Sequence, residues 1–176
     1  MIEAWTWPTP NGHKIHIALE ELGLPYKVIP VNIGKGEQFK PEFLAITPNH
    51  RIPAIVDPDG PGGKPFTLFE SAAIMMYLSE KCGGALIPRD PIGKYRCLEW
   101  MMFQMADIIT FPWIRNPDRR WIDMATYPHV KRWHDAVAAR PAVQRGVQVL
   151  AENQRKGQIT DAERENYFGK TQFSAR

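Results

Sequence analysis

Cysteine is scarce in this chain of 176 residues, which contains only Cys82 and Cys97. The two cysteines do not form a Cys-x-x-Cys pair, and they offer neither a disulfide framework nor the ligand spacing of a zinc site. Redox chemistry in this protein would therefore have to come from a thiol that belongs to a bound molecule.

Long hydrophobic runs are also lacking. The most apolar segment, residues 97–113, is interrupted by carboxylates at Glu99 and Asp107 and is short for a bilayer crossing. Residues 1–8 carry no basic lead and no long apolar stretch, which argues against a secretory signal or a transit peptide. We therefore expect a cytoplasmic protein that has no membrane partner.

A large charge of one sign is absent too. The formal net charge is +3, and the basic excess lies in residues 115–176, where twelve lysines and arginines stand against seven aspartates and glutamates. Aromatic side chains do not alternate with these basic residues in a pattern that would stack on bases. The sequence thus predicts a solvated helical surface and no nucleic-acid partner.

The first half of the chain has the alternating pattern of a small α/β domain. A helical stretch with a buried face at Ile15, Ala18, Leu19 and Leu22 ends at Gly23, a typical residue after a helix. The order β-α-β followed by β-β-α is the thioredoxin-like topology. No cysteine occupies the first loop, which argues against a thioredoxin or glutaredoxin. The predicted strands are residues 2–7, 26–31, 54–57 and 66–69, and the other predicted helices are residues 41–46 and 72–81.

The second half of the chain is helical throughout. A Gly-Gly pair and Pro88 form a linker, and no strand pattern follows it. We predict a thioredoxin-like domain at residues 1–82, a linker at residues 83–90 and an all-α domain at residues 91–176. Helical spacing predicts a core position for the apolar residues of the first long helix. These residues are Leu98, Met101, Met102 and Met105.

The residues around the third and fourth strands predict a binding site for an extended ligand. If the bond between Ile52 and Pro53 is cis, the backbone groups of Ile52 turn outward to pair with such a ligand. Glu70 follows the fourth strand and supplies a carboxylate for an ammonium group. Ser71 is the expected N-cap of the next helix, where a hydroxyl and free N–H groups favour a carboxylate. A ligand with an amine and a carboxylate on one carbon would fit.

The segment at residues 8–14 (Pro-Thr-Pro-Asn-Gly-His-Lys) is expected to be the loop between the first strand and the first helix. Thr9 and Asn11 can donate hydrogen bonds to a thiolate, which is the reactive form of a thiol with an ordinary pKa of about 8.5. Thr and Asn before Gly are also ordinary turn and capping residues. The presence of Glu70 and Ser71 decides in favour of the functional interpretation.

His13 and His16 have a three-residue spacing that can nominally bind a metal ion. No third ligand accompanies them, so the sequence predicts surface histidines and no metal site.

Four segments together resemble one branch of the glutathione transferase superfamily, the nu-class bacterial enzymes, which are relatives of the yeast prion-forming nitrogen regulator. The resemblance covers residues 1–88. It implies glutathione as cosubstrate, a disulfide or a small electrophile as second substrate, and a homodimer. The segments are residues 8–14, 34–39, 48–55 and 69–71.

The same resemblance implies a role for each matching residue. Thr9 and Asn11 would lie at the glutathione sulfur and act as the catalytic residues. The backbone of Ile52, beside Pro53, would pair with the cysteinyl unit of the tripeptide. The remaining matches would bind its two ends: Gln38 and Arg51 the glycine end, Glu70 and Ser71 the γ-glutamyl group.

The helical half departs from this family. The first long helix runs almost directly into Asp107, so about half of that helix and all of the next are missing relative to the family. The shortened domain leaves two functions open, an enzyme and a non-catalytic glutathione-binding regulatory or interaction protein. It would also leave an apolar patch that favours association, formed by Trp100, Met101, Met102 and Phe103.

Overall fold

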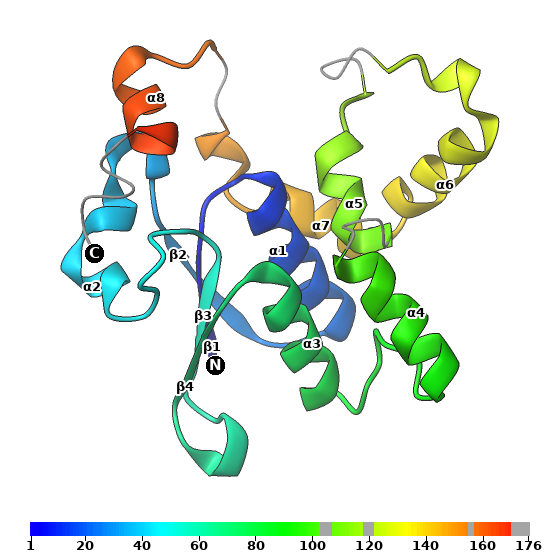
Figure 1. Cartoon of the computed structure of the whole chain (residues 1–176), viewed down its shortest axis with the longest axis horizontal. Coiled ribbons are helices and arrows are strands. Elements are labelled where there is room, and N and C mark those ends of the chain that lie inside the picture. The colour runs from blue at the N-terminus through cyan, green and yellow to red at the C-terminus, as the bar shows by residue number, and fades with distance from the viewer. Residues whose placement is uncertain (103–106, 118–121, 155–156, 170–176) are drawn as a thin grey trace. The chain divides into compact units, whose positions relative to one another are not determined.

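The computed structural model describes residues 1–102, 107–117, 122–154 and 157–169 (Figure 1). The chain divides into two compact units, each built from separate segments of the sequence. One unit contains Met1–Pro8, Pro25–Glu70 and Leu150–Arg176, and the other contains Thr9–Leu24 and Ser71–Val149. We call them the sheet unit and the helical unit.

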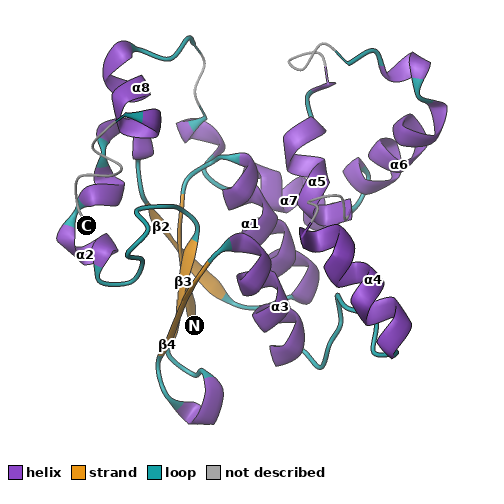
Figure 2. Cartoon of the chain, in the orientation of Figure 1, coloured by secondary structure: helices purple, strands orange, loops and turns teal. Residues whose placement is uncertain are grey.

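The sheet unit contains a mixed four-stranded sheet with the strand order β2-β1-β3-β4 (Figure 2). β1 pairs with β2 in parallel, with Ile2 opposite Tyr26, whereas β3 is antiparallel to both of its neighbours. The bounds of the strands are β1 Ile2–Thr6, β2 Tyr26–Pro30, β3 Ala54–Asp57 and β4 Phe66–Phe69.

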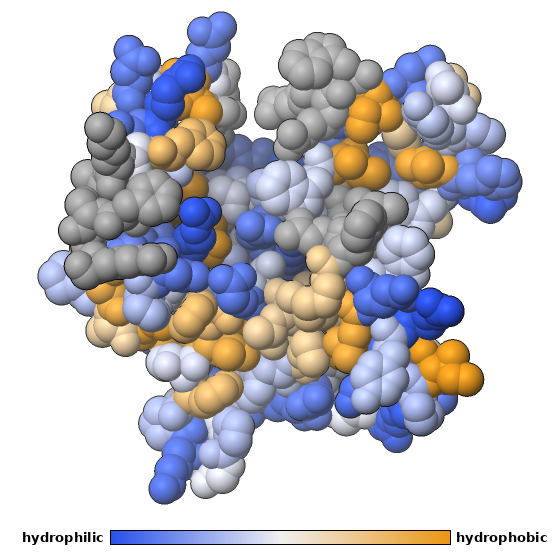
Figure 3. All heavy atoms as spheres, in the orientation of Figure 1, coloured by the Kyte–Doolittle hydropathy of each residue, from blue (hydrophilic) through white to orange (hydrophobic). Residues whose placement is uncertain are grey.

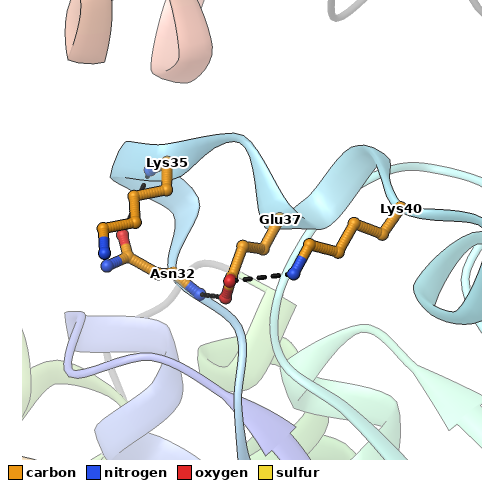
Figure 4. A network of polar contacts seen from close by, with 4 residues as sticks. All are labelled: Asn32, Lys35, Glu37 and Lys40. Carbon is orange, nitrogen blue, oxygen red and sulfur yellow. Dashed lines mark hydrogen bonds and ion pairs between the residues drawn. The ribbon is translucent and has the colours of Figure 1, made fainter.

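Short helices fill the connection between β2 and β3. They are the 3-10 turns η1 (Ile33–Lys35) and η2 (Glu37–Phe39) and the helix α2 (Pro41–Leu44). The side chain of Glu37 ties this segment together, because it accepts from the backbone N–H of Asn32 at 2.7 Å and from Lys40 at 2.9 Å (Figure 4). These bonds, the Asn32 N–H first, lower the pKa of Glu37.

The C-terminal helix α8 (Asp161–Phe168) begins with a capping box, in which Thr160 and Glu163 bond each other's backbone N–H groups. Its other end contacts the connection between β2 and β3. Asn166 donates from Nδ2 to the carbonyl of Gly34 at 2.8 Å. The carbonyl of Asn166 accepts from Nε2 of Gln38 at 3.0 Å. This part of α8 therefore belongs to the packing of the sheet unit.

The helical unit is built around α1 (Pro10–Leu22), which contacts three other helices, α3, α5 and α7. Its buried core contains Ile17 of α1, Phe111 of α5, Val137 of α6 and Val143 of α7. The remaining helices are α3 (Ser71–Lys81), α4 (Pro91–Met102), α5 (Asp107–Ile114), α6 (Pro128–Ala138) and α7 (Pro141–Gln148).

The backbones of α1 and α7 come very close at Gly146. A Cβ atom added there would lie 2.8 Å from the Cα, N and Cγ1 atoms of Ile17. Ion pairs support the same contact at its edge, where Arg140 bonds both carboxylate oxygens of Glu21 at 2.6 and 2.7 Å. Glycine is favoured at position 146 because two of these three atoms belong to the backbone of Ile17 and cannot move aside cheaply.

Several predictions of local structure are confirmed. The strands at residues 54–57 and 66–69 have the predicted bounds, and Gly23 ends α1 with a left-handed φ of 61°.

None of the described helices is both long and apolar enough to span a membrane.

Other predictions of local structure are wrong. His13 and His16 do not lie on the surface: they are 1% and 0% exposed, because α1 is surrounded by helices and has almost no solvent face. Residues 10–14 are not loop, since α1 begins at Pro10, a residue well suited to the first helical turn. Met102 is not in the core but 69% exposed, whereas its neighbour Met101 is buried.

Candidate functional site

The start of α1 holds Thr9 and Asn11. Thr9 is the N-cap: its backbone is extended, and its Oγ1 accepts from the N–H of Gly12 at 3.2 Å. A hydroxyl that accepts one hydrogen bond can still donate its own proton. Capping and donation to a thiolate are therefore compatible roles for Thr9.

Asn11 lies in the first turn of α1, and its Oδ1 atom is buried. Within the described part of the chain this atom has no hydrogen-bond partner. A buried polar atom without a partner carries a free-energy cost, so it is a candidate contact for a ligand.

Two basic side chains lie in the helical unit near this end of α1. Lys14 is 3% exposed and places its Nζ atom 5.9 Å from the ring centroid of Trp113 in α5, which is a cation–π distance. Arg115, just after α5, is close enough to lower the pKa of His13. Both basic side chains thus lie beside α1 within the helical unit.

His13 and His16 form a buried, neutral pair, with ring centroids 5.5 Å apart. Burial is the main cause that lowers the pKa of His13 to about 4, and Arg115 adds to it. Burial also lowers the pKa of His16 to about 3, followed by the effect of His13. The Gly146 carbonyl opposes both shifts without overcoming them. Among the described residues, no group of three or more metal-binding side chains is present.

In the sheet unit, the segment before β3 has a defined hydrogen-bond pattern. The bond between Ile52 and Pro53 is cis, which is the condition under which the sequence predicts that the backbone of Ile52 faces a ligand. Asn49 accepts from the backbone N–H of Arg51 at 3.1 Å and donates to Oε1 of Glu70 at 3.1 Å. The structure thus brings the segment before β3 and the end of β4 together through Asn49.

Glu70 has a left-handed φ of 71°, which is uncommon for a residue with a branched or long side chain. Its carboxylate is exposed. Ser71 follows it directly as the first residue of α3, so the prediction that Ser71 is the N-cap is wrong, and Glu70 holds that position. Non-glycine residues with such backbone strain gather at functional sites, so Glu70 is a strong candidate for ligand binding.

The two side chains predicted to bind the glycine end of the ligand, Gln38 and Arg51, differ in their exposure to solvent. The side chain of Gln38 is 1% exposed, and its Nε2 atom is bonded to the carbonyl of Asn166 in α8. Arg51, in contrast, is exposed. Neither Asn49 nor Asn166 is singled out as a contact residue by the sequence alone. Nothing local marks Asn166 as a partner of Gln38, because the two are 128 residues apart.

The predicted site residues are distributed over both units. Gln38, Arg51, Ile52, Pro53 and Glu70 belong to the sheet unit, and Thr9, Asn11 and Ser71 belong to the helical unit.

Comparison with known proteins identifies the family. The model of the glutathione S-transferase N-terminal domain matches residues 9–81. Disulfide-bond oxidoreductase YfcG of Escherichia coli is 35% identical over an alignment of 199 residues, gaps included. The alignment covers 81% of this chain and 92% of YfcG. The chain belongs to the glutathione transferase superfamily.

Two further members of the superfamily match most of the chain. Disulfide-bond oxidoreductase YghU of Escherichia coli is 26% identical over 82% of this chain and 73% of its own length. A glutathione transferase family member from Pseudomonas fluorescens, solved with two glutathione molecules bound, is 33% identical. It covers 83% of this chain and 92% of its own chain, with a TM-score of 0.78.

Ure2p shares the fold, with a TM-score of 0.74, 21% identity and coverage of 84% of this chain and 93% of its own. The resemblance to the glutathione transferase superfamily is confirmed by YfcG and by the Pseudomonas fluorescens structure, and so is the α/β thioredoxin-like domain followed by helices.

Proposed function

We propose that this protein binds glutathione and uses the glutathione thiolate to reduce disulfides or to attack small electrophiles. The observation that carries the proposal is the backbone of Glu70, which has a left-handed φ of 71° and leads directly into Ser71 at the start of α3. This arrangement offers a carboxylate for an ammonium group and, next to it, the N–H groups of a helix start for a carboxylate. Two relatives support the proposal, because YfcG and YghU are both disulfide-bond oxidoreductases by name. The Pseudomonas fluorescens structure, which contains bound glutathione, supports it as well.

In this proposal each part of the tripeptide has its own residues. Glu70 and Ser71 bind the ammonium and the carboxylate of the γ-glutamyl group. The backbone of Ile52, before Pro53, pairs with the cysteinyl unit, and Arg51 neutralises the glycyl carboxylate. Gln38 contacts the glycine end, although its amide already bonds Asn166.

Thr9 and Asn11 act on the sulfur. A thiol with a pKa of about 8.5 is mostly protonated at neutral pH, so donors that favour the anion raise the reactive fraction. Thr9 can donate its hydroxyl proton while its oxygen keeps the cap on α1.

The reaction follows from thiol–disulfide exchange. The thiolate attacks one sulfur of the substrate disulfide, forms a mixed disulfide with it, and expels the other sulfur as a thiolate. A second glutathione then releases the first half as a thiol. One disulfide is reduced to two thiols, and two glutathiones are oxidised to glutathione disulfide. No cysteine of the protein takes part, and a cytoplasmic location, where thiols stay reduced, suits this chemistry.

A second candidate is a non-catalytic glutathione-binding protein that regulates or contacts a partner. It is favoured by the alignment with YfcG, whose 199 positions exceed the 176 residues of this chain, so that YfcG has residues where this chain has none. We place this shortening in the predicted helical domain, residues 91–176, after the predicted linker at residues 83–90.

We also propose that the protein is a homodimer. α4 exposes large apolar side chains, and hydrophobic atoms lie at the surface over this helix (Figure 3). Large exposed apolar patches on soluble proteins mark sites of association. The exposed fractions are 78% for Ile92, 70% for Tyr95, 47% for Trp100 and 69% for Met102.

One pair of variants tests the catalytic proposal. Thr9→Ser keeps both the cap and the hydroxyl proton, whereas Thr9→Gly weakens the cap by only about a few tenths of a kcal/mol and removes the hydroxyl without adding a charge. We expect both to fold and to bind glutathione. Thr9→Gly should raise the pKa of the bound thiol. Each pKa unit should lower disulfide reduction about threefold, because the loss of thiolate is partly offset by the higher nucleophilicity of the more basic thiolate.

Two measurements decide the outcome: calorimetric titration with reduced and oxidised glutathione, and a disulfide-reduction assay. Equal turnover by Thr9→Gly and Thr9→Ser would show that Thr9 does not activate the thiol. Binding without turnover by the wild type would favour the second candidate.

A further inference from the structure

Asn49 makes three hydrogen bonds that join separate parts of the sheet unit. Its Nδ2 donates to Oε1 of Glu70 at 3.1 Å. Its Oδ1 accepts from Oγ1 of Thr47 at 2.5 Å and from the backbone N–H of Arg51 at 3.1 Å. One amide therefore contacts the carboxylate after β4 and the backbone before β3.

These partners fix the orientation of the amide. The N–H of Arg51 can only donate, so the atom that faces it must be the oxygen Oδ1. The nitrogen Nδ2 is then turned toward Glu70, where the carboxylate can only accept. A flipped amide would place two donors together and two acceptors together, so the assignment of the two atoms follows from the network itself.

The backbone on each side of Asn49 is anchored. Thr47 is 0% exposed, and His50 is 6% exposed and packs on Phe39 with ring centroids 5.5 Å apart. Asn49 therefore extends its amide from a fixed base and not from a mobile loop tip. Such a base can restrain a flexible and exposed carboxylate side chain, which otherwise loses rotamer entropy when it binds a ligand.

We infer that Asn49 is the positioning residue of the ammonium site: by holding Oε1 of Glu70, it leaves Oε2 directed at the amine of the ligand. This inference rests on the proposed function of Glu70. Asn49 touches no reacting atom, and it acts through the carboxylate. Its effect should therefore depend on whether the ligand has an α-amino group.

A purely structural role for Asn49 is the competing explanation, because the same side chain also supports the segment before β3. Asn49→Ser separates the two roles. A serine hydroxyl can still accept from the N–H two residues later, as in an ST-turn, but it is too short to reach Glu70. Thr47→Val is the matched control, since it removes one hydrogen bond of the segment and keeps the contact between Asn49 and Glu70.

The ligands are glutathione and glutaryl-cysteinyl-glycine, which is glutathione without its α-amino group. Calorimetry gives the ratio of their dissociation constants for the wild type, Asn49→Ser and Thr47→Val, and urea unfolding checks each fold. We expect the wild type to prefer glutathione by about tenfold or more, the size of a charge-assisted hydrogen bond. Asn49→Ser should reduce this preference by roughly threefold or more, and Thr47→Val should preserve it.

Each outcome has a separate meaning. An unchanged preference in Asn49→Ser, with both ligands weakened equally, would overturn the positioning role and leave the proposed function intact. Failure of the wild type to bind glutathione would overturn both. If Asn49→Ser does not fold while Thr47→Val does, the preference is measured in Asn49→Thr, which also keeps a hydroxyl acceptor and lacks the reach, and the same criteria apply.

Discussion

The buried histidine pair makes a quantitative prediction: acid should destabilise the protein well above the pH at which carboxylates are protonated. The pKa of His13 is lowered from 6.5 to about 4 in the folded state, and that of His16 from 6.5 to about 3. In the unfolded chain both return to about 6.5. Between these values the unfolded state binds more protons, so stability falls as the pH falls below 6.5.

The magnitude follows from the same values. At pH 5 an unfolded histidine lies about 1.5 pH units below its pKa, and at about 1.4 kcal/mol per unit this costs the folded state about 2 kcal/mol for each histidine. Folded His13 and His16 are still neutral at this pH. The pair should therefore remove up to about 4 kcal/mol between pH 7 and pH 5, a large part of the 5 to 15 kcal/mol of a typical domain.

Urea unfolding at pH 7, 6 and 5 measures this loss. His13→Gln should be less stable than the wild type at pH 7, because a different side chain fills a tight site, but its stability should depend on pH only about half as steeply. His129→Gln is the control, since His129 is exposed on α6. The lowered pKa of Glu37 acts in a lower window, because its contribution is lost only below about 4.5. Equal slopes for His13→Gln and the wild type between pH 6.5 and 5 would refute the reasoning.

Two further predictions concern packing within each unit. Gly146→Ala should destabilise the helical unit by about 1 to 3 kcal/mol, because its Cβ would overlap the backbone at Ile17. Gly157→Ala should be nearly neutral, because an added Cβ would have no atom of the described residues within 4 Å. Equal midpoints of urea unfolding for Gly146→Ala and Gly157→Ala would refute the packing argument. Asn166→Ala removes the hydrogen bond to Gly34 and should cost about 1 kcal/mol, seen as faster amide exchange in α8. Arg164→Ala, at an exposed position of α8, should leave that exchange unchanged; equal exchange in both variants would show that the bond does not hold α8.

The sequence predicted those parts of the fold that depend on local signals. Gly23 has no side chain to resist a left-handed φ, and the turn residues between β3 and β4 isolate two short strands. Local chemistry was sufficient for these elements. Glu70 and Ser71 could be singled out because a carboxylate stands beside an expected helix start, and their roles in binding stay predictions.

The features that the sequence did not predict depend on tertiary contacts. His13 and His16 are polar, and nothing near them in the sequence says that α7 approaches within backbone distance at Gly146. The contact between Asn49 and Glu70 spans 21 residues, and that between Gln38 and Asn166 spans 128. Hydrogen bonds across such separations are set by the packing of whole elements, which a single sequence does not reveal.

Calorimetric titration of the wild type, Glu70→Ala and Ser71→Ala with reduced glutathione tests the proposed ammonium site directly. We expect saturable binding by the wild type and a loss of about 1.5 to 3 kcal/mol of binding free energy in Glu70→Ala, which removes the partner of the ammonium group. Ser71→Ala should lose less, because the N–H groups at the start of α3 remain. Undiminished affinity in both variants, or no binding by the wild type, would contradict the central claim.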